Sequence, residues 1–215
     1  AIGYAVGDFG INLYFTSAMT YLLYFYTDVM GLSATATAGV MALARTVDAV
    51  TDPVMGMIAE RTRSRFGRLR PWLILGALPL GVITILTFTV PDLDANGKLW
   101  WAYTTYLLFG ILYTVVTIPY SVLTASITSD YAARTKLSTW RMACAFTGGL
   151  TVSVGTKPFV DLFADPADGF QALMAVFAVI ATGLLVTTFA TAKERVTPAP
   201  EQQLTLKLSM QAVFL

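Results

Sequence analysis

Ionisable residues inside a strongly apolar stretch are the first chemical feature of this sequence. Arg45, Asp48 and Asp52 lie within the apolar segment 36–58, with Asp48 about halfway along it. In an α-helix, which has about 3.6 residues per turn, spacings of three and four place these side chains on one face. A charge in hydrocarbon costs about 2.5–3.5 kcal/mol on insertion scales, so such groups normally face a polar interior and each other. The spacing therefore predicts a polar face on a membrane-embedded helix.

Two kinds of site fit these side chains. An ion pair between Arg45 and Asp48 would be purely structural, but it uses one acid and leaves Asp52 without a role. Two carboxylates one turn apart, with Thr51 beside them, supply the hard oxygen ligands that suit a small cation. The same two acids could share a proton, because like charges close together are unfavourable. We favour a cation or proton site at Asp48 and Asp52, and the structural ion pair is the alternative.

Further polar side chains in the apolar segments are consistent with a cavity. Asp8 and Asn12 lie one turn apart near the start of the first segment, where Asp8 either faces the interior or begins a helix. Arg141 opens the fifth segment and either faces the interior or snorkels to the surface. Hydroxyl side chains around Pro119 either line the cavity or bond back to their own helix. They are Tyr113, Thr114, Thr117, Tyr120 and Ser121.

Long apolar runs must position these residues. Of the 215 residues, 56% are hydrophobic and only 13% are charged, about half the charged share of a soluble domain. A helix needs about 20 residues to cross the hydrocarbon core of a bilayer, and six stretches qualify. They cover approximately residues 11–29 (or from residue 2), 36–58, 72–90, 99–123, 138–163 and 172–192. The sequence therefore predicts an all-α membrane protein with six transmembrane helices.

The composition excludes several classes of chemistry. The chain contains no His and a single Cys, Cys144, which excludes His-based triads, His-containing zinc sites, intrachain disulfides and CxxC motifs. It has no nucleophile–base constellation and no phosphate-binding glycine loop. The Arg-rich segment is short and bounded by apolar runs, so nucleic-acid binding has no support. We therefore expect neither an enzyme, nor a resident cofactor, nor a nucleic-acid partner.

Charges between the apolar segments alternate in sign. Segment 60–70 contains five Arg and one Glu, and segment 130–136 and the tail after Ala192 also carry Lys and Arg. The intervening loops carry Asp and almost no Lys or Arg. Because basic loops stay on the cytoplasmic side, the pattern predicts six crossings and a cytoplasmic N-terminus, most simply in a bacterial inner membrane.

The chain is expected to have two parts. Residues 1–193 should form an N-terminal six-helix transmembrane bundle, and residues 194–215 a cytoplasmic central linker with the start of a further segment. Residues 197–203 are polar and contain proline, as linkers do. Residues 204–215 turn apolar again, which indicates the start of a new span or of an interfacial helix.

Several motifs follow one another in a fixed order. The most specific is Arg45-x-x-Asp-Ala-x-x-Asp-Pro-x-x-Gly56, followed by Arg61-Thr-Arg-Ser-Arg-Phe-Gly-Arg-Leu-Arg-Pro71. Residues 4–12 precede it, and Ile118-Pro-Tyr120 and Arg141 continue it. These motifs resemble the glycoside–pentoside–hexuronide:cation symporters of the major facilitator superfamily. Members of that superfamily have two six-helix halves, so the resemblance implies an N-terminal half, a 3+3 helix bundle, with the start of the central loop.

The resemblance implies a role for individual residues in cation binding. Asp48 and Asp52 match the paired acids of the cation site, and Thr114 matches a polar partner from the fourth helix. Thr51 stands where a galactoside-transporting member has Asn; it keeps an oxygen and loses the amide. The coupling ion is expected to be Na⁺ or H⁺, with Asp48 and Asp52 as the metal ligands if it is Na⁺.

The resemblance also implies a substrate pocket. Tyr113 and Arg141 match sugar-binding positions, whereas Asn12 and Thr117 replace Asp residues of the galactoside-transporting member. Ser121 replaces its Trp. These replacements argue against a galactoside and leave a sugar or sugar derivative, including an anionic hexuronide near Arg45 and Arg141.

We therefore expect a cation-coupled secondary transporter that works by alternating access with a C-terminal six-helix half, in a lipid bilayer. Gating or structural roles fall to Asp8, Arg45, Arg61, Arg65 and Arg68. The basic segment should pair with acidic groups or helix C-termini and stabilise one gating state, unless it only sets the topology. The alternatives are a symporter of an amphipathic solute, such as a lysolipid, and a non-transporting scaffold subunit of a larger complex.

Overall fold

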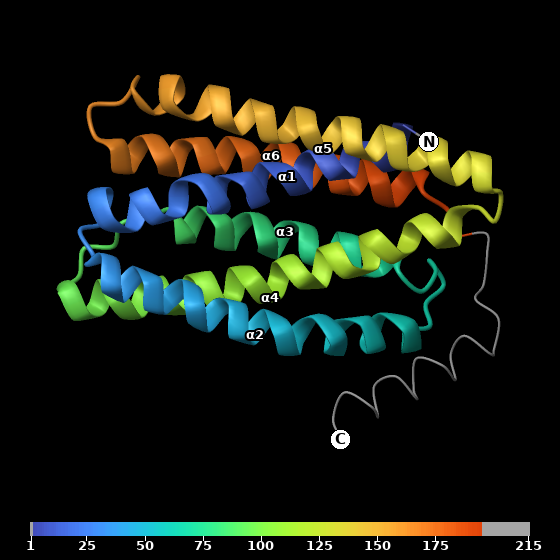
Figure 1. Ribbon diagram of the computed structural model, residues 1–215, viewed down its shortest axis with the longest axis horizontal. Coiled ribbons are helices and arrows are strands. Elements are labelled where there is room, and N and C mark those ends of the chain that lie inside the picture. Colours follow the sequence, from blue (N-terminus) through green and yellow to red (C-terminus); the bar gives the residue numbers. More distant parts are fainter. Residues whose placement is uncertain (1, 195–215) are drawn as a thin grey trace.

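The computed structural model describes residues 2–194, which form a bundle of six long α-helices (Figure 1). They are α1 (Ile2–Tyr24), α2 (Ala34–Arg61), α3 (Arg70–Thr87), α4 (Ala95–Ile127), α5 (Tyr131–Val160) and α6 (Pro166–Thr191). A π-helical turn, η1 (Phe25–Val29), continues α1. Each of the six apolar segments is helical, so the predicted six-helix, all-α fold is confirmed. Of the linker and apolar tail predicted at 194–215, residues 195–215 lie outside the described residues.

The helices have the dimensions of membrane spans. The shortest, α3, has 18 residues, which is about 27 Å at a rise of 1.5 Å per residue. By length and composition, α3, α4 and α6 are each apolar enough to cross a membrane. The other three helices carry most of the polar side chains singled out by the sequence. Their polar residues face both ways: Asp8 and Asp52 are at least partly buried, whereas Arg45 and Lys157 are exposed.

Side-chain caps define where several helices begin. The hydroxyl of Ser33 accepts a hydrogen bond from the first turn of α2, and the carboxylates of Asp94, Asp130 and Asp165 do the same for α4, α5 and α6. A carboxylate at a helix N-terminus also interacts favourably with the helix dipole. Loop acids that mark membrane topology in the sequence therefore also start helices.

Helix packing divides the bundle into two layers. Helix α1 packs mainly on α5 and α6, α2 packs mainly on α4, and α3 contacts both α4 and α6. Figure 1 shows α1, α5 and α6 on one side and α2 and α4 on the other. Few backbone positions of α1 lie close to α2 or α4 in the described part of the chain, although side chains of α1 and α4 meet. We call the boundary between these two layers the seam.

Glycines allow α1 to lie close to both partners in its layer. A Cβ at Gly148 of α5 would lie 2.8 Å from the carbonyl oxygen of Phe9, and one at Gly10 would lie 3.0 Å from Cα of Ala181 in α6. Small residues at such points let helix backbones approach and pack tightly in membranes. The layer α1–α5–α6 is therefore held by close backbone packing.

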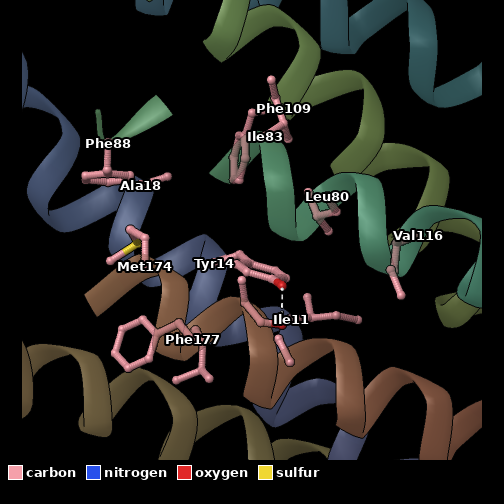
Figure 2. Close-up of a cluster of buried hydrophobic side chains, with 14 of the residues drawn as sticks. Ile11, Tyr14, Ala18, Leu80, Ile83, Phe88, Phe109, Val116, Met174 and Phe177 are labelled. Carbon is pink, nitrogen blue, oxygen red and sulfur yellow. Dashed lines mark hydrogen bonds between the residues drawn. The ribbon is translucent and has the colours of Figure 1, made fainter. Parts of the chain in front are cut away.

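A buried apolar cluster joins this layer to α3 and α4. Tyr14 is fully buried within it and donates a hydrogen bond to the carbonyl oxygen of Ala178, 3.4 Å away. Figure 2 shows Tyr14 among apolar side chains that include Ile11, Leu80 and Phe177. Because this face of α1 is buried, another face, which carries Phe15 and Met19, borders the seam.

Candidate functional site

A cavity of about 160 Å³ lies in the seam, between α1, α2 and α4. Its polar lining contains Arg45, Asp48, Asp52, Thr114 and Thr117. Its aromatic lining contains Phe15, Tyr106, Phe109 and Tyr113. The structure therefore brings together residues of both predicted sets. Arg45, Asp48, Asp52 and Thr114 were predicted for cation binding or charge, and Tyr113 and Thr117 for substrate binding.

Asp52 joins α2 to α4 at the wall of the cavity. The Thr114 hydroxyl donates a hydrogen bond to Oδ1 of Asp52 over 2.7 Å. Thr114 is buried, at 4% exposure, while Asp52 is only partly buried. One carboxylate oxygen is therefore fixed by α4, and the carboxylate also borders the cavity.

Asp48 lies beside the same cavity with a loosely held partner. Nη1 of Arg45 is 3.6 Å from Oδ2 of Asp48, and the two side chains are 56% and 26% exposed. An ion pair this exposed contributes about 0–1 kcal/mol to the free energy of unfolding. The predicted ion pair thus exists, but it does not remove Asp48 from the cavity.

A glycine of α4 accommodates the Asp48 carboxylate. A Cβ at Gly110 would lie 2.9 Å from Oδ1 of Asp48, closer than side chains normally approach. Only glycine at this position leaves Asp48 its observed place against α4. Nothing in the sequence singles out Gly110, since its role depends on the distance between two helices.

The oxygen set at this wall fits a small monovalent cation or a proton. Two carboxylates and one hydroxyl are hard ligands of the kind that alkali and alkaline-earth ions prefer. Within the described residues, no group of three or more His, Cys, Asp or Glu side chains could hold a metal ion. Thr51 does not reach the cavity lining, and its hydroxyl bonds back to the carbonyl oxygen of Asp48 over 3.4 Å. Cation binding by Asp48, Asp52, Thr114 and Thr51 stays a prediction.

A row of aromatic rings forms another part of the lining. Phe15 stacks on Tyr113 with ring centroids 6.0 Å apart, and Tyr113 on Phe109 at 5.9 Å. Phe109 in turn stacks on Tyr106 at 6.0 Å. The spacing of positions 106, 109 and 113 is that of one helical face. The row was not predicted, although the spacing of its three α4 residues is visible in the sequence.

Asp8 and Arg141 form a second charged site, outside the cavity lining. Nε of Arg141 lies 2.5 Å from Oδ2 of Asp8, and Nη2 lies 3.3 Å from Oδ1. The Tyr120 hydroxyl also donates to Oδ2 of Asp8, over 2.9 Å. Both charged side chains are largely buried, at 21% exposure for Arg141 and 11% for Asp8. Arg141 thus joins α5 to α1 and does not extend to the surface.

Two further residues complete this site, which we call the tyrosine–arginine network. The Tyr4 hydroxyl donates to the carbonyl oxygen of Tyr120 over 2.5 Å and lies 2.8 Å from the hydroxyl of Thr124. The Arg141 guanidinium lies over the rings of Tyr120 and Tyr4, 4.8 and 5.5 Å from their centroids. The sequence did not predict this contact, because Tyr4 lies 116 and 120 positions away from Tyr120 and Thr124.

Other predicted substrate residues are dispersed. Thr117 lines the cavity, although its hydroxyl donates to the carbonyl oxygen of Tyr113 in its own helix. Asn12 donates to the carbonyl oxygen of Asp8 and faces Gly148 of α5, while Ser121 is exposed. Neither belongs to the cavity lining of the described residues. A substrate role for Asn12, Tyr113, Thr117, Ser121 and Arg141 stays a prediction.

The basic segment, residues 60–70, lies against the end of α6. The Glu194 carboxylate accepts hydrogen bonds from the backbone N–H groups of Arg68, Leu69 and Arg70 at 3.0, 2.8 and 3.2 Å. Gly67, with φ of 109°, makes the turn here, and a Cβ on it would lie 2.5 Å from Glu194. A carboxylate at the start of α3 also matches the positive end of the helix dipole.

Arg70 completes this contact. Its guanidinium donates to the carbonyl oxygen of Phe189 near the C-terminus of α6 and lies 4.8 Å over the Phe189 ring. The expected pairing with an acid and with a helix C-terminus is therefore present, but Arg70 and the backbone make it. Arg61 and Arg65 have exposed side chains, and that of Arg65 lies over Phe66. Gating roles for Arg61, Arg65 and Arg68 stay predictions.

Six long helices around a charged cavity define a class, the helical membrane bundles. The chain matches the family described as MFS/sugar transport protein over residues 3–213, and it belongs to that family. The resemblance drawn from the motifs is thus confirmed at the level of the family.

Individual relatives agree with this assignment. The chain is 43% identical to the inner membrane symporter YicJ of Escherichia coli over 93% of its own length and 44% of the relative. It is 36% identical to the isoprimeverose transporter of Lactiplantibacillus pentosus over 98% of its length and 45% of the relative. The chain thus spans less than half the length of these relatives.

A solved structure supports the fold. The chain superimposes on the proton:xylose symporter XylE with a TM-score of 0.64 and 17% identity, over 90% of this chain and 44% of that one. At this identity the likeness concerns the fold alone. It confirms the predicted six-helix half of a major facilitator bundle.

Proposed function

We propose that this chain acts as the N-terminal half of a cation-coupled transporter for a sugar or sugar derivative. It would work by alternating access in a bilayer together with a second six-helix half. The observation that carries the proposal is the pair of carboxylates, Asp48 and Asp52, on the wall of a cavity that also has an aromatic lining. Intramembrane acids facing a cavity mark ion pathways in membrane proteins.

Charge balance explains how the ion would couple to the substrate. The lining carries two carboxylates and one guanidinium, so a bound Na⁺ or H⁺ brings its formal charge to zero. A cation held between α2 and α4 would strengthen the link that Thr114 and Asp52 already make. The ion thereby favours one conformation of the cavity walls. Only such a differential affinity can shift a conformational equilibrium.

The lining also supports the substrate class. Stacked rings offer flat apolar surfaces, and the hydroxyl of Thr114 and the carboxylates offer hydrogen-bonding partners, as small-molecule pockets combine them. Related proteins are named as symporters or as a transporter of isoprimeverose. A neutral xylose- or glucose-containing glycoside is therefore the first substrate to test.

The basic segment is part of the proposal. Glu194 and Arg70 link the start of α3 to the end of α6. Such contacts between helix ends can break and form again when a helix bundle rotates as a rigid body. We assign this contact to the stabilisation of one gating state.

Cytoplasmic placement of the N-terminus rests on the basic loops. Cys144 is the only thiol of this chain, so it can be replaced by Ser before single cysteines are introduced. A cysteine at Ser64 should react with an impermeant reagent only from the cytoplasmic side, and one at Ala95 only from outside. Labelling of both from the same side would contradict the six-span topology.

Gradient-driven uptake by the full-length protein tests the function. Vesicles are given an inward Na⁺ or H⁺ gradient and a panel of labelled sugars that includes isoprimeverose, xylosides and glucosides. The wild type should accumulate at least one of them, whereas Asp52→Asn should lose both accumulation and cation dependence. The amide keeps the shape of the side chain but removes the charge that binds the cation.

Two variants serve as controls. Asp28→Asn changes an exposed acid beside Thr27 and should leave coupling intact. If Asp48 only pairs with Arg45, Arg45→Gln together with Asp48→Asn should restore transport by removing both charges. Normal accumulation by well-expressed Asp52→Asn protein would rule out the cation site. Uptake of no panel sugar under either gradient would favour a scaffold or another solute class.

A further inference from the structure

The two layers of the bundle touch unevenly along the seam. Beside the cavity, α1 meets α4 through the stacked rings of Phe15 and Tyr113. Toward the end of the bundle that carries the N-terminus (Figure 1), α4 instead meets α1 and α5 in a dense polar contact. That contact is the tyrosine–arginine network of Tyr4, Asp8, Tyr120, Thr124 and Arg141.

Hydrogen-bond directions in the network follow from its acceptors. The Tyr4 hydroxyl donates to the carbonyl oxygen of Tyr120, so the Thr124 hydroxyl must donate to Tyr4. Thr124 in turn accepts from Nη1 of Arg141 over 2.5 Å. The Tyr120 hydroxyl has two acceptors in reach, the carbonyl oxygen of Tyr4 at 2.8 Å and the Asp8 carboxylate at 2.9 Å. All these bonds except the Asp8–Arg141 pair connect α4 to the other layer.

Shape reinforces these bonds. The rings of Tyr4 and Tyr120 stack with centroids 4.7 Å apart and an interplanar angle of 23°. A Cβ at Gly7 of α1 would lie 2.6 Å from Cε2 of Tyr120, so a glycine makes room for the ring. Both tyrosines are buried. Because a satisfied, buried polar network is rigid, it fixes the distance between α1 and α4 at this level.

The network lies next to the cavity but separate from the proposed cation ligands. Tyr120 follows the cavity residue Thr117 by three positions, which is about 4.5 Å along the helix axis. The ligands Asp48, Asp52 and Thr114 belong to α2 and α4 alone, on one side of the seam. The aromatic lining, in contrast, includes Phe15 from the opposite side.

We propose that Tyr4, Tyr120 and Thr124 are positioning residues of the transport site. Their hydrogen bonds fix α1 against α4 and so set the width of the cavity, on which binding of a substrate across the seam depends. The cation site does not need them, because both of its helices lie in one layer. The part of this proposal that concerns substrate binding rests on the proposed transport function, whereas the part that concerns helix spacing does not.

Spin-label distances test the spacing without any substrate. In full-length protein with Cys144→Ser and any other native cysteines replaced, labels at Ile2→Cys and Ile58→Cys span the seam. Labels at Ile58→Cys and Ala125→Cys lie within α2 and α4; all three positions are exposed. Tyr120→Phe combined with Thr124→Val should lengthen or broaden the first distance and leave the second unchanged. Tyr120→Phe combined with Thr124→Ser, which restores one hydroxyl, should recover part of the parent distance.

Binding assays test the consequence for the site. The probes are NaCl or a pH step for the cation, and p-nitrophenyl α-xyloside and α-glucoside for the sugar. In the Tyr120→Phe, Thr124→Val protein the cation response should stay within about twofold of the parent, while the glycoside half-saturation rises about tenfold or more, the change expected for 1.4 kcal/mol. Equal weakening of both would indicate general damage and would overturn the positioning role.

The outcomes separate the two proposals. An unchanged seam distance, or equal changes in both label pairs, contradicts the positioning role whatever the protein transports. If the parent binds neither glycoside and responds to no cation, the proposed transport function fails, and the distances alone decide the positioning role. A longer seam distance with an unaltered α2–α4 distance supports it in either case.

Discussion

The two charged sites of this bundle treat their acids in opposite ways. Asp8 accepts hydrogen bonds from both Arg141 and Tyr120 and is buried. Asp48 has Arg45 as its ion-pair partner, 3.6 Å away, and borders a cavity together with Asp52. One site is closed by protein partners, whereas the other keeps carboxylate oxygens at an open space.

This difference separates structure from function among intramembrane acids. A buried charge is tolerated when a partner and hydrogen bonds satisfy it, and removing the partner is then strongly destabilising. A carboxylate at a cavity has only some of its oxygen lone pairs bonded to protein groups, so a mobile cation can bind to the others. The Asp8 site should therefore respond to mutation in stability, and the Asp48–Asp52 site in ion binding.

The largest expected effect concerns the closed site. Arg141→Gln leaves the Asp8 carboxylate buried without its cation and should lower the free energy of unfolding by about 3 kcal/mol. Arg45→Gln removes an exposed partner and should change the free energy of unfolding by less than about 1 kcal/mol. Thermal unfolding in detergent measures both.

A double variant serves as the control for this prediction. Asp8→Asn together with Arg141→Gln removes both charges and should recover most of the stability that Arg141→Gln loses. If Arg141→Gln proved no more damaging than Arg45→Gln, the contrast between the two sites would not hold.

An intermediate effect is expected where α4 supports Asp48. Gly110→Ala places a methyl group 2.9 Å from Oδ1 of Asp48, so the carboxylate must move. The cation concentration that gives half-maximal uptake should rise about tenfold, which corresponds to 1.4 kcal/mol. Gly183→Ala is the matched control, because a Cβ there meets nothing within 4 Å. An equal response of both variants would show that Asp48 does not depend on its place against α4.

The smallest effect concerns the hydrogen bond between Thr114 and Asp52, which joins α4 to α2. Thr114→Val removes the donor to Asp52, and one such bond contributes about 1 kcal/mol, or about fivefold in cation half-saturation. Thr114→Ser keeps the hydroxyl and should behave like the wild type. Cation titration of uptake compares the three proteins, and an unaffected Thr114→Val protein would remove Thr114 from the cation site.

Much of the fold could be predicted because its signal is local. Six apolar runs gave six helices, and the possible early start of the first helix at residue 2 is observed. The same holds for Asp48 and Asp52, whose spacing on one helix placed them together without knowledge of any neighbour. Their polar partner Thr114 came from the family resemblance, and it does lie at Asp52.

The partners of distant residues could not be predicted in this way. Arg141 was assigned to a substrate pocket or to the surface, yet its guanidinium contacts Asp8, which is 133 positions earlier in the chain. The contact between the basic segment and α6 was expected, but not that Arg70 and Glu194 would make it. Sequence spacing carries no information about which faces of two separate helices meet.

The sequence by itself determined the membrane-spanning helices and the presence of acids inside them, because hydropathy and helical periodicity act within a single segment. Only the tertiary structure decided which acid is closed and which stays at a cavity. That choice depends on where α1 packs, and glycines at positions 10 and 148 let it lie against α6 and α5 and not against α2. The resulting seam leaves Asp48 and Asp52 beside an open space, whereas Asp8 is enclosed by side chains from α4 and α5.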